Sequence, residues 1–232
     1  MGKYSRDCLN AVKKLCENLE IELHIYDIKK EMGSSMCYLR SSIQSKKSLK
    51  NCAICGVIKK WILNREARKL KADKIATGHH LDDEIQTFML NVLKGNPELS
   101  ANSGAITKNI PDKKFIPRIK PLFYIPEEEI REYAKAKKLP VVYEKCPCAI
   151  DSYRIQIREF MKNLSRKEKE NIMKNAEKIL ERVEHRSVYT LKGTSPKLRN
   201  TGAKKSKITY CEKCGEPSRN QICKMCELTK DF

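Results

Sequence analysis

The chain has 232 residues, and its 48 Lys and Arg against 29 Asp and Glu give a formal net charge of +19. So basic a balance predicts a polyanionic partner and places a neutral substrate at a disadvantage. The 40% of hydrophobic residues suffice for a buried core, which excludes wholesale disorder. No apolar run approaches the about 20 residues that cross a bilayer, so we expect no membrane association.

Eleven cysteines are present, an odd number that suits a disulfide framework poorly. Several of them have the spacing of metal ligands instead. We therefore expect free or metal-bound thiols and a reducing, cytoplasmic location.

The first half of the chain alternates predicted helices and strands. Apolar residues recur at three- and four-residue steps over residues 5–19, which indicates an amphipathic helix with Cys8 and Cys16 in the core. The β-branched and aromatic run 21–28 predicts a buried strand. A helix over 52–70 follows, with Ile54, Val57, Ile58, Trp61 and Ile62 on its buried face. A strand is expected over 73–77 and a further helix over 84–93.

The second half continues the pattern. Pro126 followed by three Glu predicts a helix start, residues 140–143 suit a short strand, and a helix is expected over 165–183. That last helix opens with a Ser165-x-x-Glu168 capping box and places Ile172, Ala176, Ile179 and Val183 inward. Alternation at this spacing predicts an α/β fold with a Rossmann-like parallel sheet.

A basic segment precedes the C-terminus. Residues 185–207 contain seven Lys or Arg and no acidic residue, together with Gly193, Pro196 and Gly202. A solvated tether would have this composition, but next to a metal-binding tail on a +19 chain we favour contact with phosphates.

The C-terminal cysteines form two pairs. Cys211-x-x-Cys214 and Cys223-x-x-Cys226 lie eight residues apart, the pattern of four thiolates around one tetrahedral Zn²⁺. A site closed by four cysteines has no open position, so its role is structural or RNA-docking. We therefore predict a small zinc ribbon.

A third pair, Cys52-x-x-Cys55, stands at the start of a predicted helix, where the helix dipole favours thiolate, and Lys59 follows one turn later. Taken alone it fits a redox pair, half a zinc site or half an iron–sulfur site. Cys146 follows the predicted strand 140–143, and strand ends are where open α/β sheets bind ligands. With Cys146 the pair would ligate an iron–sulfur cluster with one iron unliganded by cysteine, and Cys148 would be a spare thiol.

The turn Gly78-His-His-Leu-Asp-Asp-Glu84 also follows a predicted strand. A carboxylate there would hold Mg²⁺ on a nucleotide. Helix capping and a solvated turn explain the same residues equally well.

Taken together these segments resemble the N-type ATP pyrophosphatase family of tRNA 2-thiouridine synthetases. The resemblance is carried by Asn51-Cys-Ala-Ile-Cys-Gly-Val-Ile-Lys-Lys, Asn64-Arg-Glu-Ala, Thr77-Gly-His-His-Leu-Asp-Asp-Glu, Pro117-Arg-Ile-Lys-Pro-Leu, Lys145-Cys-Pro and the terminal four cysteines.

The resemblance implies that ATP adenylates the C2 oxygen of a tRNA uridine and that sulfur then displaces AMP. It makes Cys52, Cys55 and Cys146 the ligands of a 4Fe–4S cluster, or alternatively thiols that carry a persulfide. Lys59 and Asp83 become active-site charges, and Gly78 and His79, with Asp83, contact ATP and Mg²⁺. It also implies a sulfur donor, either sulfide or a ubiquitin-like carrier protein, and dimerisation through a zinc module is open.

The chain departs from the family's pattern at its start. The pyrophosphate loop Ser-Gly-Gly-x-Asp-Ser is missing, no two glycines are adjacent, and the N-terminal zinc module is missing too. We interpret the sequence as an N-terminally truncated member with a catalytic domain over 1–184, a basic linker over 185–207 and the ribbon over 208–232. On its own it is expected to bind ATP poorly, because the loop's backbone N–H groups cradle the phosphates.

Two rival functions explain parts of the sequence. A non-catalytic tRNA- or RNA-binding protein would use the ribbon and the basic linker. An electron carrier would use Cys52 and Cys55, but it accounts for neither the charge nor the ribbon.

Overall fold

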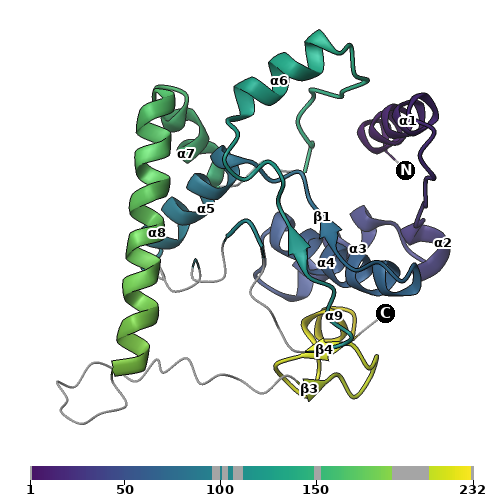
Figure 1. Cartoon of the computed structure of the whole chain (residues 1–232). Coiled ribbons are helices and arrows are strands. Elements are labelled where there is room, and N and C mark those ends of the chain that lie inside the picture. The colour runs from purple at the N-terminus through teal and green to yellow at the C-terminus, as the bar shows by residue number, and fades with distance from the viewer. Residues whose placement is uncertain are drawn as a thin grey trace. The chain divides into compact units, whose positions relative to one another are not determined.

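The computed structural model describes residues 2–95, 100, 104–106, 112–148, 153–189 and 209–230 (Figure 1). Two compact units compose the chain, and each is described by itself. Unit 1 comprises residues 1–61, 128–152 and 224–232, and unit 2 comprises 62–127 and 153–223. Within the described ranges, no helix combines the length and apolar character that a bilayer crossing requires.

Unit 1 is helical. Its elements are α1 (Lys3–Asn18), α2 (Ile28–Met32), α3 (Met36–Lys46), the first part of α4 (Asn51–Lys69), α6 (Glu127–Ala136) except its first residue, and α9 (Lys224–Leu228). Its buried apolar side chains include Leu39 and Ile43 of α3 and Ile54 and Ile58 of α4. The helix predicted over 52–70 is therefore confirmed as α4, and Ile54 and Ile58 are buried as its periodicity predicts.

The predicted first helix also forms, as α1, but it is not part of the core. None of its residues is buried, and Cys8 and Cys16 are only half-buried. The prediction that both thiols belong to the core is wrong, because the periodic spacing defines an apolar face without showing what covers it.

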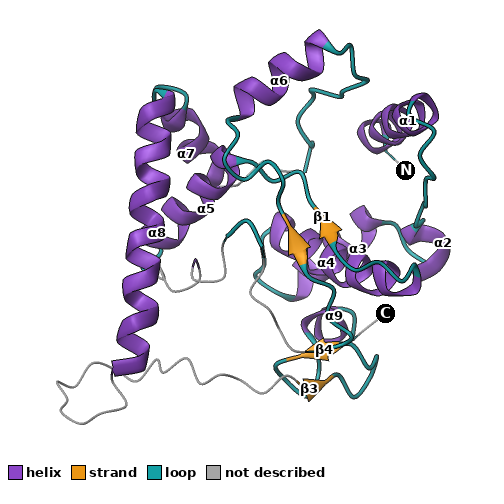
Figure 2. Ribbon diagram, in the orientation of Figure 1, coloured by secondary structure: helices purple, strands orange, loops and turns teal. Residues whose placement is uncertain are grey.

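Unit 2 contains the βαβ pattern. Strand β1 (Ile75–Ala76) pairs in parallel with β2 (Arg118–Ile119), with Ile75 opposite Arg118, and α5 (Leu81–Leu93) lies between them in the sequence. Figure 2 shows the two arrows running in the same direction. The parallel pairing expected from the alternation of elements is thus confirmed for this pair, and α5 begins three residues earlier than predicted.

The core of unit 2 joins three helices. Leu81 and Ile85 of α5 pack with Ile157 and Met161 of α7 (Tyr153–Met161), and Met173 of α8 (Arg166–Tyr189) joins the same cluster. In Figure 1, α5 lies against both α7 and the long α8. A buried Phe123 completes the cluster.

The capping box of α8 is confirmed. The carboxylate of Glu168 accepts hydrogen bonds from the Ser165 backbone N–H at 2.7 Å and from its hydroxyl at 2.6 Å. Ala176 is buried as predicted, but Ile179 is 45% exposed, and the side chain of Val183 lies outside the described residues. The helix continues to Tyr189, whereas residues 190–207 of the basic segment lie outside the described part, so the proposed domain limits stay predictions.

The strands predicted over 21–28 and 140–143 are wrong. Residues 21–27 and 140–143 have no regular structure, and Ile21, Ile25 and Val141 are 57%, 53% and 44% exposed. Strand propensity describes how a segment fits a sheet, and no described strand pairs with either segment. The segment 21–27 ends at Asp27, whose carboxylate accepts hydrogen bonds from the backbone N–H groups of Lys29 and Lys30 and so caps the start of α2.

Candidate functional site

The thiols of unit 1 gather around the first turns of α4. The helix begins at Asn51, so that Cys52 lies in its first turn with an exposed side chain, and Cys55 is half-buried. Lys59, one turn further on, hydrogen-bonds the Cys55 sulfur. The structure thus brings together the cysteine and the lysine that the spacing places on one face of the helix.

The Cys55 thiol has a raised pKa, contrary to the lowering expected from a helix N-terminus. Burial has the largest effect and raises it, the charge of Lys59 lowers it, and Cys146 and Cys52 raise it again. Half-burial therefore outweighs both the lysine and the position on the helix. The same balance places Cys52 and Cys146 each within electrostatic reach of Cys55.

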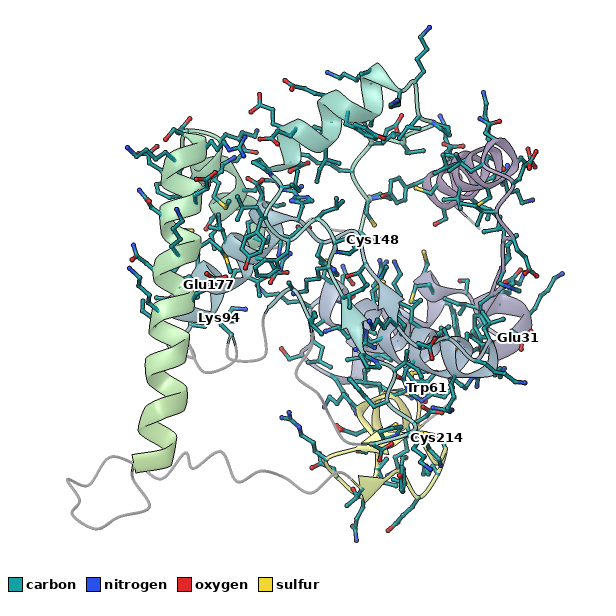
Figure 3. All side chains as sticks on the ribbon, viewed as in Figure 1. Glu31, Trp61, Lys94, Cys148, Glu177 and Cys214 are labelled. Carbon is teal, nitrogen blue, oxygen red and sulfur yellow. The ribbon has the colours of Figure 1, made fainter. Side chains whose placement is uncertain are left out.

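Two further thiols lie beside Cys146, and the sequence did not identify them as a group. Cys148 (Figure 3) hydrogen-bonds Arg40, Cys146 and Cys37. Arg40, the largest influence, lowers the pKa of the Cys148 thiol. Cys37 and Arg40 belong to α3, more than 100 residues away in sequence, and only the surplus of cysteines hinted that more thiols take part.

The donor set of Cys52, Cys55 and Cys146 is chemically suited to an iron–sulfur cluster. All three are free thiols, and two of them are exposed. Among the described residues, only the terminal four cysteines approach closely enough to hold a single ion. Cysteine thiolates are the usual ligands of iron–sulfur clusters, and three of them would leave one iron of a four-iron cluster without a cysteine ligand.

In unit 2, the turn after β1 is held by Thr77. Its N–H donates to the Ile119 carbonyl at 2.9 Å, and its hydroxyl lies 2.9 Å from Nδ1 of His79. Gly78 and His79 are exposed, and a Cβ added at Gly78 would meet no atom within 4 Å. The space beside this glycine is therefore open to a ligand.

The three consecutive acidic residues that follow have different environments. Asp82 is buried and accepts from the Glu127 N–H and from Lys169, both at 2.7 Å. Buried Glu84 is bound by Lys120 at 2.7 Å. Asp83 is 20% exposed and lies 3.3 Å from Nε2 of His80. Asp83 is thus the most exposed of the three carboxylates.

The C-terminal ribbon consists of β3 (Thr209–Tyr210), β4 (Pro217–Ser218) and α9, and the boundary between the units falls inside it, after Cys223. The sulfurs of Cys211, Cys214, Cys223 and Cys226 all lie within 4.8 Å of one another, with Cys214 and Cys223 3.6 Å apart. Tetrahedral zinc with Zn–S bonds of about 2.3 Å separates its ligand sulfurs by about 3.8 Å. The four thiols therefore fit a zinc ion, as their spacing predicts.

Hydrogen bonds prepare one of these thiols for a metal. Burial would raise the pKa of Cys211, but backbone N–H groups of Cys223, Cys214 and Lys213 point at its sulfur and bring the pKa down to about 6. The Cys223 N–H lies 3.2 Å from that sulfur. Metal ligation requires the thiolate, which these donors stabilise.

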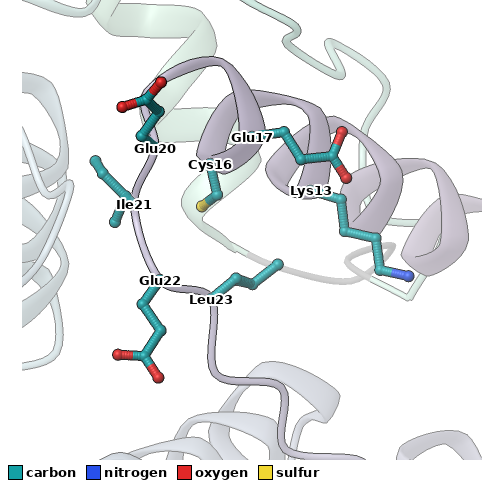
Figure 4. Close-up of a pocket in the computed structure, with 7 residues that line it drawn as sticks. All are labelled: Lys13, Cys16, Glu17, Glu20, Ile21, Glu22 and Leu23. Atoms are coloured by element: carbon teal, nitrogen blue, oxygen red, sulfur yellow. The ribbon is translucent and has the colours of Figure 1, made fainter.

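A pocket in unit 1 lies away from all of these residues. It is formed by the end of α1 and the segment after it, and is lined by Lys13, Cys16, Glu17, Glu20, Ile21, Glu22 and Leu23 (Figure 4). No predicted site residue lines it. The pocket therefore does not locate the chemistry.

Comparison with known proteins places the chain among similar sequences. Residues 3–164 match the model of a PP-loop domain family. The chain is 30% identical to the tRNA 2-thiolation protein NcsA of Haloferax volcanii, covering 99% of this chain and 69% of that protein. It is 32% identical to a probable sulfurtransferase of Methanocaldococcus jannaschii and to the cytoplasmic tRNA 2-thiolation protein 1 of Danio rerio, covering 93% and 97% of this chain.

A solved structure matches as well. It is that of the U34-tRNA thiolase NcsA from Methanococcus maripaludis with its 4Fe–4S cluster, at 28% identity and a TM-score of 0.70 over 97% of this chain and 65% of that one. The match confirms the predicted α/β fold. The chain spans 58% and 60% of the length of the M. jannaschii and D. rerio relatives.

Proposed function

Because the chain belongs to the PP-loop domain family, we propose that it is an ATP-dependent tRNA sulfurtransferase, which adenylates a uridine C2 oxygen and inserts sulfur to give 2-thiouridine. The observation that carries the proposal is the contact of Lys59 with the Cys55 thiol, within electrostatic reach of Cys52 and Cys146. The reaction needs a cation near the ATP phosphates and thiols near the transferred sulfur, and Lys59 and the cysteines provide both kinds of group.

In this proposal, each residue of the nucleotide step has a role of its own. Lys59 neutralises the charge that develops on the phosphates during adenylation. Asp83 holds Mg²⁺. Gly78 and His79 line the adenosine pocket, where the open space beside Gly78 admits the ligand.

The sulfur step falls to the cysteines. Cys52, Cys55 and Cys146 hold a 4Fe–4S cluster, and Cys52 and Cys146 are the two exposed thiols of the three. When bound, such a cluster would supply an iron without a cysteine ligand, which is open to sulfide. If no cluster is present, the same thiols carry the sulfur as a persulfide, received by transfer from a donor persulfide, because sulfide or a thiocarboxylate would need a two-electron oxidant to form it.

The remaining assignments concern partners. The net charge of +19 suits tRNA, and the terminal cysteines hold a structural Zn²⁺. The sulfur donor is sulfide or a ubiquitin-like carrier protein. We place the protein in the cytoplasm and leave a homodimer through the zinc ribbon as part of the proposal.

The 232-residue chain itself is expected to bind tRNA but to release little AMP from ATP, since its sequence contains no Ser-Gly-Gly-x-Asp-Ser. The measurement is AMP release and 2-thiouridine content after anaerobic incubation with tRNA, ATP, Mg²⁺ and sulfide. Fusion to a segment carrying that loop should raise both. Clear turnover by the unfused chain would contradict this expectation.

Lys59→Ala in the fused protein tests the proposed function directly. Loss of a preorganised charge at the transferring phosphate is expected to lower AMP release by about 10²–10³-fold, with tRNA binding retained. Lys60→Ala, the neighbouring lysine, is the matched control. If Lys59→Ala and Lys60→Ala release AMP equally fast, the role proposed for Lys59 is wrong. If the fused protein binds tRNA but forms no 2-thiouridine, the non-catalytic RNA-binding function explains the chain better.

A further inference from the structure

A buried carboxylate projects from the ribbon of unit 2 onto α4. Both carboxylate oxygens of Glu216 are bound by the guanidinium of Arg68, which gives the bidentate geometry typical of strong Arg–carboxylate pairs. The Glu216 side chain is only 6% exposed and that of Arg68 30% exposed. The pair therefore differs from the weak ion pairs of protein surfaces.

Two neighbours complete the contact. Buried Asn64, one turn before Arg68, donates to Glu216 at 3.2 Å and to the Lys114 carbonyl at 2.8 Å, and accepts from the Ile116 N–H at 3.0 Å. The ammonium of Lys114 donates to the Gly215 carbonyl at 3.0 Å. The second half of α4 thus binds the ribbon through a satisfied network of buried polar groups.

The same carboxylate residue belongs to the first metal-binding turn. Its carbonyl accepts from the Cys211 N–H at 2.9 Å, and the N–H of Gly215 donates to the Cys211 carbonyl at 2.8 Å. Gly215 adopts φ +68°, a left-handed conformation that lets the turn close directly after Cys214. Whatever fixes Cys211 and Cys214 therefore also fixes the direction of Glu216.

We propose that Arg68 and Glu216 form a metal-dependent latch: Zn²⁺ at the four cysteines shapes the turn that presents Glu216, and Glu216 then anchors the ribbon to α4. The inference rests on the metal site proposed above. Without the metal the turn loses its shape, and Asn64 and Arg68 lose the carboxylate that satisfies them. By thermodynamic reciprocity, loss of the latch must weaken metal binding by the same factor by which metal strengthens the latch.

Zinc affinity of the full chain tests the latch. Glu216→Gln and Arg68→Ala are each expected to weaken zinc binding by about 10-fold or more in competition with a chromophoric chelator, as other outer-shell partners of metal ligands do. The double variant should be no weaker than the weaker single variant, because either change removes the same contact. Glu212→Gln on the ribbon and Lys69→Ala on α4 are the matched controls, and both should bind like the wild type.

Failure of the metal site and failure of the latch give different results. The zinc bound by the ribbon is measured as the difference in zinc content between the wild type and Cys223→Ser. If the two proteins bind the same amount of zinc, the metal site itself is refuted. If the ribbon binds zinc and both Glu216→Gln and Arg68→Ala bind it with the affinity of the wild type, the latch is refuted. Hydrogen exchange of residues 62–69 supplies a second measurement: chelation should speed exchange there in the wild type and leave Glu216→Gln unaffected, and this comparison holds even if Arg68→Ala does not fold.

Discussion

Cys146→Ser is expected to abolish loading of the iron–sulfur cluster in the anaerobically reconstituted chain. A cluster held by three thiolates loses a third of its protein ligands, and a serine hydroxyl does not replace a thiolate on iron. Iron and acid-labile sulfide per chain, together with the visible absorbance of the brown protein, measure the loss. Thiolation by the loop-fused protein should fall with it.

The neighbouring thiols provide the controls. Cys148→Ser and Cys37→Ser remove sulfurs that contact Cys146 or its neighbour but are not assigned as ligands, and Cys16→Ser removes one in α1. All three should keep the cluster. Loss in Cys148→Ser with retention in Cys146→Ser would transfer the third ligand to Cys148, and a colourless wild type would remove the cluster from the proposal.

Helices were predictable from sequence because their causes are local. The faces of α4 and the Ser165–Glu168 box of α8 depend on residues three or four positions apart, and both formed as expected. Strands depend on a partner elsewhere in the chain. Residues 21–28 have the composition of a buried strand, yet no described strand pairs with them, whereas the two-residue β2 was not predicted at all.

The site divides along the same line. The sequence predicted that Lys59 would meet Cys55 and that the terminal cysteines would converge, since both follow from short spacing. No pattern in the sequence predicted that Arg40 lies beside Cys148. None predicted that Arg68 binds Glu216, 148 residues further along the chain. Contacts of that kind are set by how distant segments pack, and no local pattern encodes them.

Asp82 and Asp83 show the limit most clearly. In sequence they are adjacent and equivalent, and either would serve as a helix cap or a magnesium ligand. In the structure, Asp82 connects three segments of unit 2: it stands on α5, accepts the N–H of Glu127 and binds Lys169 of α8. Packing, not spacing, therefore separates a structural carboxylate from a functional one.

The structural role of Asp82 predicts a pH dependence. Burial raises the pKa of its carboxyl, but the Glu127 N–H and Lys169 outweigh burial and leave the pKa below its ordinary value. A carboxyl with a lowered pKa in the folded state adds stability above its unfolded pKa of about 3.9. That contribution should be complete above about pH 5 and should disappear as the pH falls through the folded pKa.

Asp82→Ala is accordingly expected to lower the free energy of unfolding by about 1–3 kcal/mol, because it leaves the ammonium of Lys169, whose side chain is 14% exposed, and the N–H of Glu127 without this partner. Urea unfolding followed by circular dichroism at pH 7 measures the change. The difference from the wild type should shrink as the pH drops below 4, where protonation removes the same interaction from the wild type.

Asp83→Ala is the matched control, one residue along the same helix. Its partly exposed carboxylate faces only His80 among the contacts described, so its removal should change stability by no more than about 0.5 kcal/mol. In the loop-fused protein the same variant should lose most AMP release, whereas any loss in Asp82→Ala should follow the fraction of protein that is unfolded. Equal destabilisation by the two variants would show that the buried contacts of Asp82 do not support the fold of unit 2, and full activity of Asp83→Ala would remove it from the nucleotide site.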